Sequence, residues 1–143
     1  MSCGNVGDRT CECDAEAILI WEEVMPTLVG FGTFAALPEE EISEKISRRI
    51  LSGDQGMLVW WSIGAGVHVE PHTHENEQIV WMLKGKMEFR LGSEQRVCGQ
   101  GDVVVIPGGT EHEAWFREDS EVITWSSIRA IAVTIMPTRR AVC

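Results

Sequence analysis

The sequence predicts an all-β fold, either a sandwich or a barrel, and two patterns carry this prediction. From Gly56 onward, short apolar stretches recur at nearly regular spacing between turns that contain glycine, and no long helical pattern interrupts them. Within 86–91, Met87, Phe89 and Leu91 alternate with charged residues, so this strand has one apolar and one solvated face. The predicted strands cover residues 57–63, 67–72, 77–83, 86–91, 103–107, 112–116 and 121–127.

The chain of 143 residues has the length of one domain. Residues 1–15 are small and polar without a hydrophobic period, so we expect a flexible N-terminal arm followed by a single domain over 16–143. The apolar run 17–21 suits an edge strand or an arm that lies across a neighbouring subunit. The apolar stretch beyond residue 127 is expected to pack on the barrel or on a partner subunit.

The segment that begins at Pro38 supports two interpretations. Ile42, Ile46 and Ile50 recur every four residues, and Pro38 followed by three glutamates is typical of a helix start. Ile46, Arg48 and Ile50 also alternate as they would on a strand. The residues alone leave both structures open.

Charge and hydropathy exclude two classes of partner. The net charge is -10, with 12 basic residues against 22 acidic ones, whereas nonspecific nucleic-acid binding needs clustered lysine and arginine. The longest apolar run is shorter than the roughly 20 residues that a membrane-spanning helix needs. The N-terminus shows no secretory leader. We therefore expect a cytoplasmic protein that binds neither nucleic acid nor membrane.

Four residues in two separate stretches form a candidate metal site. His72 and His74 lie two residues apart, so on an extended strand both side chains leave the same face. Gln78 opens the next apolar run, and His112 begins a later predicted strand. Three imidazoles and one amide oxygen make a four-point cradle for a divalent metal ion that leaves room for water or substrate.

The spacing of these residues resembles the two motifs of the cupin superfamily. The first motif is a glycine, five residues, His-x-His, three or four residues, an acid, six residues and a glycine. The second is a glycine, five residues, Pro-x-Gly, two residues and a histidine, with an asparagine three residues further on in many members. The matching residues are Gly66, His72, His74, Gln78 and Gly85 for the first motif and Gly101, Pro107, Gly109 and His112 for the second, with Phe116 in place of that asparagine.

The resemblance covers roughly residues 57–127 and implies a single-domain jelly-roll β-barrel whose interior brings the metal ligands together. Because it also implies strands upstream of this range, we expect a short helical turn near Pro38–Ser43 and a strand over about Lys45–Ser52. Most metal-binding cupins carry glutamate where this chain has Gln78. Members with glutamine there include small enzymes that linearise unsaturated uronates, small manganese hydroxynitrile lyases and certain isomerases.

The neutral Gln78 favours redox-neutral chemistry. Without a carboxylate ligand, a divalent ion keeps its full charge and acts as a Lewis acid on a carbonyl or hydroxyl oxygen, which serves isomerisation, ring opening or lyase chemistry. Two alternatives stay open: a metal-dependent dioxygenase that cleaves a C–C bond of a small dicarbonyl or aromatic substrate, and a non-catalytic cupin that binds a small molecule. The ion could be manganese, iron, nickel, cobalt or zinc.

Further site residues follow from strand parity and from the family. Val80, Met82, Met87, Phe89 and Phe116 are candidates for an apolar substrate pocket. In uronate-opening cupins an aspartate and an arginine near the last strand serve the chemistry. The corresponding region here has no such aspartate, and Arg129 is its only possible basic group. His68 is a second catalytic candidate, expected to be partly exposed. Trp81 and Trp115 should lie on the face opposite the metal, packing the sheet or forming the interface of an expected homodimer.

Overall fold

A computed structural model describes residues 27–127, which form an all-β jelly roll, so the predicted fold class is confirmed. The elements are the 3-10 turn η1 (Phe34–Ala36) and the strands β1 (Glu40–Ser43), β2 (Ile46–Ser52), β3 (Gly56–Ile63), β4 (His68–His72), β5 (Gln78–Lys84), β6 (Met87–Leu91), β7 (Glu94–Cys98), β8 (Val103–Ile106), β9 (His112–Phe116) and β10 (Ser120–Ser127). No helix in this part of the chain is long and apolar enough to cross a membrane.

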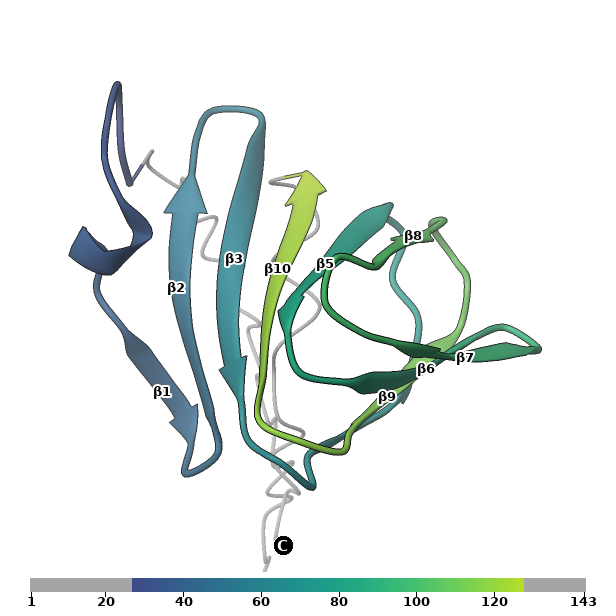
Figure 1. The fold of residues 1–143 in the computed structure, drawn as a ribbon. Helices are drawn as coiled ribbons and strands as arrows, with labels where there is room; N and C mark the ends of the chain where they lie inside the picture. Colours follow the sequence, from purple (N-terminus) through teal and green to yellow (C-terminus); the bar gives the residue numbers. More distant parts are fainter. Residues whose placement is uncertain (1–26, 128–143) are drawn as a thin grey trace, which may run out of the picture.

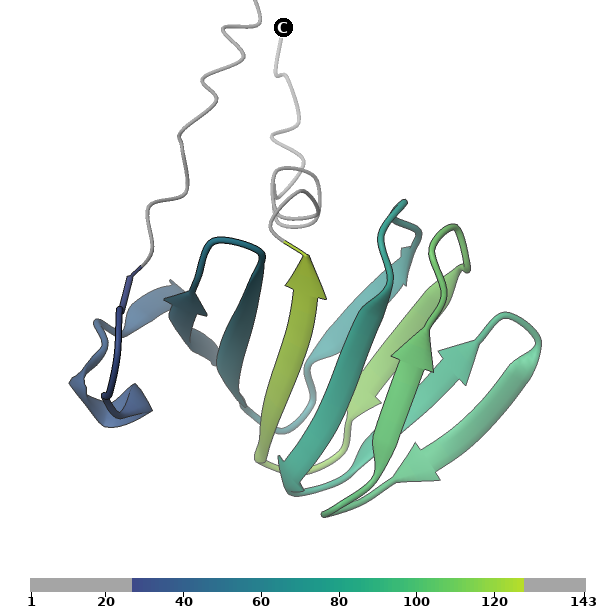
Figure 2. The ribbon, with the colours of Figure 1, turned by 90° about the horizontal axis from the view of Figure 1, so that it is seen from above.

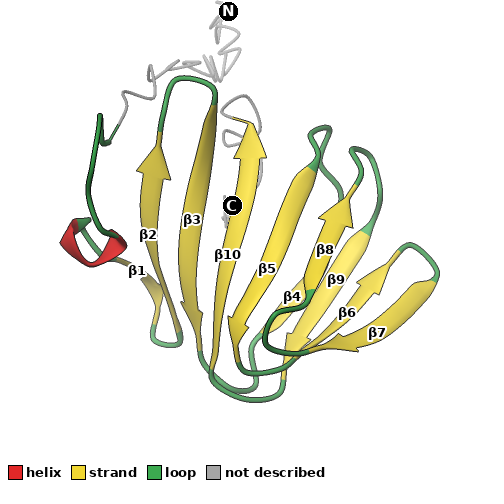
Figure 3. Cartoon of the chain, turned by 45° about the horizontal axis from the view of Figure 1, so that its top comes forward, coloured by secondary structure: helices red, strands yellow, loops and turns green. Residues whose placement is uncertain are grey.

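The strands form two antiparallel sheets that face each other (Figures 1 and 2). The six-stranded sheet has the order β1-β2-β3-β10-β5-β8, and the four-stranded sheet has the order β4-β9-β6-β7. Neighbouring strands are mostly not consecutive in the chain, as in a jelly roll. The six-stranded sheet extends past the other sheet at β1 and β2, and η1 lies at that edge (Figure 3).

The hydrophobic core lies between the sheets because each strand turns alternate residues inward. On β5 the inward residues Val80 and Met82 are 5% and 1% exposed, whereas Trp81 between them is 48% exposed. On β9 the inward residues Ala114 and Phe116 are buried in the same cluster. Burial therefore follows strand parity in both sheets.

The helical turn expected near Pro38–Ser43 is wrong, since Glu40–Ser43 is strand β1 and the one helical turn of the described residues lies earlier, at η1. Glu40 pairs with Arg48 of β2, and its Oε2 atom lies 2.8 Å from the Arg48 Nε atom. A strand partner thus outweighs the acidic helix-start pattern. The strand expected over about Lys45–Ser52 is present as β2.

Strand β7 was not predicted. Its sequence, EQRVC, alternates only weakly, and its first four residues are exposed. It forms because it pairs with β6, from Met87↔Cys98 to Leu91↔Glu94. The flexible arm over 1–15, the apolar run 17–21 and the stretch beyond residue 127 lie outside the described residues.

Candidate metal centre

Three histidines meet at one end of the barrel. His72 ends β4 and His112 begins β9, and the two are direct partners in the four-stranded sheet. His74 lies in the loop that follows β4. The ligand nitrogens of the three side chains all lie within 4.8 Å of one another, and the ring centroids of His72 and His112 are 4.1 Å apart. The fold therefore brings the predicted imidazoles together.

The loop that carries His74 is held by the turn before β9. The Gly109 N–H donates to the His74 carbonyl oxygen at 2.7 Å. A Cβ atom on Gly108 would lie 2.0 Å from the Glu75 carbonyl oxygen, a distance that excludes any side chain. Gly109 has a φ of 77°, which favours glycine. The glycines of this turn therefore let the two loops pack backbone to backbone and fix His74.

Backbone carbonyl groups orient all three imidazoles. The Nδ1 atoms of His72, His74 and His112 lie 2.8, 2.7 and 2.9 Å from the carbonyl oxygens of Glu70, Asn76 and Thr110. A carbonyl oxygen can only accept, so each Nδ1 carries a proton, and in the neutral ring Nε2 then presents a lone pair. This arrangement prepares the rings as metal ligands. Sequence reasoning could not find these contacts, because backbone groups leave no residue pattern.

Gln78 completes the cluster from the six-stranded sheet. It is the first residue of β5, and its Oε1 atom lies 2.9 Å from the His74 Nε2 atom. With the His74 proton on Nδ1, two acceptors face each other, which is unfavourable unless a cation lies between them or the amide presents its NH2 group. Two ligand atoms on one ion at right angles, with bonds of about 2.1 Å, would be about 3 Å apart. The observed spacing fits a shared cation.

His112 is the most buried of the three histidines, with 3% of its surface exposed. The pKa of His112 is lowered from 6.5 to about 4. Burial is the largest cause, the hydrogen bond to Thr110 opposes the shift, and the nearby His72 and His74 add to it. The ring is therefore neutral at physiological pH, which is the form that binds metal. The three-histidine cluster is compatible with a divalent metal ion.

The five apolar pocket candidates all lie in the core, each at most 6% exposed. Phe89 stacks on His112 with ring centroids 6.0 Å apart, and Val80 follows Gln78 by two residues on the same inward face. Phe116 lies four residues beyond His112 along β9, about 13 Å away, and it pairs with Met87. Phe89 thus adjoins His112, and all five side chains belong to one core cluster.

His68 lies on the outside of the barrel. A register shift between Val69 and His72 breaks the parity between His68 and His72. The His68 ring stacks on Trp115 with centroids 5.2 Å apart, and its Nε2 atom lies 2.7 Å from Glu113 Oε1. His68 therefore does not reach the cluster in this structure. The other catalytic candidate, Arg129, lies outside the described residues.

Glu113 sits at the centre of an ion-pair ladder behind His112. Arg90 on β6 donates to Glu113 Oε2 at 2.8 Å and to Glu111 Oε1 at 3.0 Å, so it holds both sequence neighbours of His112. Burial raises the pKa of Glu113. The hydrogen bonds from His68 and Arg90 together lower it by more, so the net shift is downward. Glu113 is thus a paired carboxylate on the outer face.

Sequence reasoning missed two hydroxyl groups on the inner face of β10. Ser126 pairs directly with Gln78, and Thr124 pairs with Val80, so their side chains share the inward face. The Thr124 hydroxyl accepts a hydrogen bond from the Trp61 indole at 3.0 Å. Strand parity could have assigned both residues to the inner face, because they alternate with Ile123 and Trp125 along the predicted strand 121–127.

An antiparallel jelly roll with histidines from two strands and a loop at one end defines a class of barrels whose interior can hold a metal ion. The comparisons agree with this description: residues 59–128 match the family model described as the cupin domain. Residues 59–128 of this chain are therefore a cupin domain. None of the curated proteins matches the sequence significantly.

Several solved structures share the fold. KdgF from Halomonas sp. is 29% identical, with 75% of this chain and 100% of that chain covered and a TM-score of 0.67. An RmlC-like cupin from Shewanella frigidimarina is 20% identical, with 72% and 94% covered and a TM-score of 0.67. The polyketide cyclase RemF from Streptomyces resistomycificus is 17% identical, with 76% and 88% covered and a TM-score of 0.64. The last two show likeness of fold alone.

Proposed function

We propose that this chain is a metal-dependent enzyme that carries out redox-neutral chemistry, such as isomerisation, ring opening or a lyase reaction, on a small carbonyl or hydroxy compound. The observation that carries the proposal is the neutral donor set. The one cluster of potential ligands among residues 27–127 contains His72, His74 and His112 and no carboxylate, and the group that adjoins it is the Gln78 amide.

The residues of this chain would divide the work between binding and orientation. His72, His74, His112 and Gln78 would hold one divalent ion, with manganese, iron, nickel, cobalt and zinc as the candidates. Such an ion supplies Lewis-acid polarisation of a substrate oxygen.

The surroundings of the four ligands offer both polar and apolar contacts to a substrate. Ser126 and Thr124, on the inward face of β10, offer hydroxyl groups for hydrogen bonds with it. Val80 and Phe89 provide apolar surface beside the ligands, so a substrate with one oxygen-rich end and one apolar portion fits best.

The test is turnover by the full-length chain loaded with manganese. The substrates would be a panel of hydroxy-ketones, unsaturated sugar acids, cyanohydrins and β-diketones, followed by product analysis and an oxygen electrode. We expect turnover without oxygen uptake, loss of turnover with EDTA and recovery on readdition of manganese. Oxygen consumption stoichiometric with product would overturn the proposal in favour of a dioxygenase.

A matched variant tests the role of the neutral amide. Gln78→Glu keeps the size and position of the side chain but adds a negative charge next to His74. We expect this variant to retain metal and to lose turnover, because the carboxylate weakens the Lewis acidity of the ion. Tight ligand binding without turnover in both proteins would instead indicate a non-catalytic binding cupin.

A further inference from the structure

The inner face of β10 changes from buried to accessible toward the candidate metal ligands. Ser120 and Val122, at the start of the strand, are 3% and 2% exposed, whereas Thr124 and Ser126 are partly exposed. All four side chains share the inward face, because residues two apart on a strand point the same way and Ser126 pairs with Gln78. Thr124 is therefore the deepest polar side chain of this face that still has exposed surface.

The Thr124 hydroxyl group is oriented by one indole ring. Trp61 Nε1 donates to Thr124 Oγ1 at 3.0 Å, and an indole N–H can only donate. A threonine hydroxyl can also donate one hydrogen bond of its own. Among residues 27–127 the Thr124 proton has no acceptor. The hydroxyl group is therefore an oriented donor on the inner face whose proton is free to bind another molecule.

Trp61 is itself fixed by packing and by a cation. On β3 its ring packs against the hydrophobic core cluster, and the guanidinium carbon of Arg48 lies 5.6 Å from its ring centroid. A guanidinium group over an indole ring is attracted to it. Arg48 Nε in turn lies 2.8 Å from Glu40 Oε2. These contacts hold the indole N–H in one direction, so the orientation of Thr124 is set before any substrate binds.

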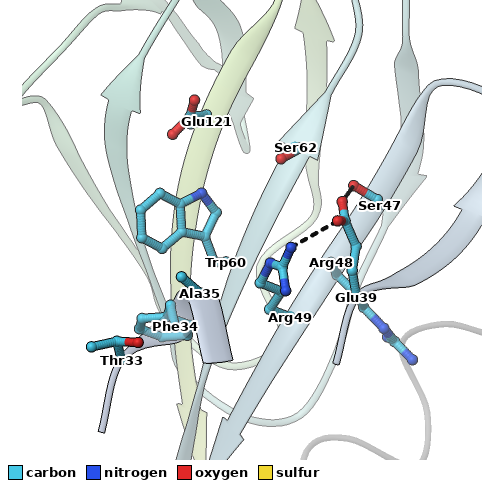
Figure 4. Close-up of a pocket in the computed structure, with 10 residues that line it drawn as sticks. All are labelled: Thr33, Phe34, Ala35, Glu39, Ser47, Arg48, Arg49, Trp60, Ser62 and Glu121. Carbon is cyan, nitrogen blue, oxygen red and sulfur yellow. Dashed lines mark hydrogen bonds and ion pairs between the residues drawn. The ribbon is translucent and has the colours of Figure 1, made fainter. Parts of the chain in front are cut away.

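Trp60, the preceding residue on β3, lies on the opposite face of the sheet. Its ring packs edge to face on Phe34 with centroids 5.4 Å apart, and both rings line a cavity of about 460 Å³ together with Arg49 (Figure 4). The two adjacent tryptophans thus serve different faces, and Trp61 alone contacts Thr124. Trp60 is therefore a matched control for Trp61.

Thr124 and Gln78 are placed to bind two ends of one small molecule. Thr124 pairs with Val80 on β5, two residues along the strand from Gln78. Strands about 4.8 Å apart with residues about 3.4 Å apart put the Cα atoms of Thr124 and Gln78 about 8 Å apart. An oxygen atom beside Gln78 and a second one at Thr124 would be separated by several covalent bonds. The carbon atoms between them would pass Val80, which supplies the apolar contact.

We propose that Thr124 is a specificity-determining residue that donates a hydrogen bond to a second oxygen atom of the substrate, and that Trp61 is its positioning residue. The first oxygen atom binds at the candidate metal centre. The substrate class is then a small compound that carries a carbonyl, hydroxyl or carboxylate group at each end of a short chain or ring. This assignment rests on the proposed function, because it requires the substrate to bind at the metal centre.

The test measures the binding of paired ligands to the manganese-loaded full-length chain by isothermal titration calorimetry. The ligands are α-hydroxy acids from butanoate to hexanoate, each with and without a terminal hydroxyl group. The α-hydroxy acid end binds the metal, and the terminal hydroxyl group probes Thr124. We expect the terminal hydroxyl group to strengthen binding to the wild type by about 5-fold to 10-fold at one chain length, as one net hydrogen bond does.

Variants at the two positions separate hydrogen bonding from packing. Thr124→Val should lose the gain from the terminal hydroxyl group and bind the acids that lack this group as the wild type does. Thr124→Ser keeps the hydroxyl and should keep the gain. Trp61→Phe removes the indole N–H and should reduce the gain by at least about 2-fold, whereas Trp60→Phe should leave it unchanged. If Thr124→Val does not fold by circular dichroism, Thr124→Ala gives the same decision.

The assignment of Thr124 is overturned if the terminal hydroxyl group brings no gain at any chain length, if none of the acids binds, or if the gain persists in folded Thr124→Val. A full gain in Trp61→Phe overturns the role of Trp61. Turnover of the substrate panel is measured on the same preparations. Turnover without a hydroxyl gain contradicts this assignment alone, whereas a hydroxyl gain without turnover contradicts the proposed enzyme alone.

Discussion

The outward faces of the two sheets differ in polarity. Behind the ligand strand β9, the four-stranded sheet carries Arg90, Glu113 and His68, whose charges and hydrogen bonds are satisfied within the chain. Behind the ligand strand β5, the six-stranded sheet carries exposed apolar side chains such as Trp81. A polar face can complete itself with internal partners, whereas an apolar face needs a second surface. One sheet therefore pairs its outward charges within the chain, and the other leaves large apolar side chains exposed.

The largest effect that tests this contrast is expected inside the six-stranded sheet. Met82 follows Trp81 but points inward and is 1% exposed, so Met82→Ala removes buried contacts and leaves a cavity. We expect the free energy of unfolding to fall by about 2–5 kcal/mol in urea denaturation. Val97→Ala, on the outside of the other sheet, should change it by less than about 0.5 kcal/mol. Equal effects would mean that burial does not follow strand parity.

The next effect separates the two faces of the four-stranded sheet. His112→Ala removes an imidazole from the inward cluster that we propose holds the metal. We expect the dissociation constant for manganese to weaken by more than about 100-fold, beyond the range of changes in residues that orient a ligand. His68→Ala removes an imidazole from the outer face and should leave that constant unchanged. Isothermal titration calorimetry measures both. A large loss of affinity in His68→Ala would show that His68 contributes to metal binding despite its place on the outer face.

The sequence predicted which three histidines come together better than it predicted their surroundings, and the reason is physical. His72, His74, Gln78 and His112 have a fixed spacing that can be recognised in the sequence. His72 and His112 meet because β4 and β9 are neighbours, and Gln78 on β5 reaches His74 in the loop after β4. The ion pairs of Arg90 with Glu111 and Glu113 form because β6 pairs with β9. No local sequence pattern indicates this pairing.

The same limit explains the errors in the fold. The helix-start pattern at Pro38 is a local preference, and pairing of Glu40 with Arg48 in a sheet overrides it. Strand β7 has almost no alternation in burial, so only its pairing with β6 reveals it. Parity did place Trp81 on the face away from the ligands, because a strand alternates regardless of its partners.

A smaller effect should connect the outer ladder with the inner site. Arg90→Met keeps much of the side-chain volume but releases Glu111 and Glu113, the neighbours of His112. We expect manganese affinity to fall by about 10-fold, the lower end of the range for residues that orient ligands. Arg96→Met is the control, since Arg96 pairs with the exposed Glu94 on β7. If both variants bind manganese as the wild type does, the ladder stabilises the sheet without positioning His112.

The last effect is a pH dependence that belongs to the inner face. The pKa of His112 is about 4 in the fold against an ordinary value of 6.5. Between these values the unfolded chain binds a proton that the folded chain does not, so this contribution to stability is complete above pH 6.5 and is lost as the pH falls toward 4. This contribution to the free energy of unfolding changes by at most about 1.4 kcal/mol per pH unit, because one proton is involved.

Metal-free protein, treated with EDTA, should therefore lose stability in urea denaturation as the pH falls through this window, and His112→Asn should lose less of it. The difference between the two curves isolates His112 from the carboxylates of the outer ladder, because both proteins keep Glu113 and its partners. Parallel curves would show that the His112 ring gains a proton as readily in the fold as in the unfolded chain. Burial on the inner face would then not disfavour the charged form of His112.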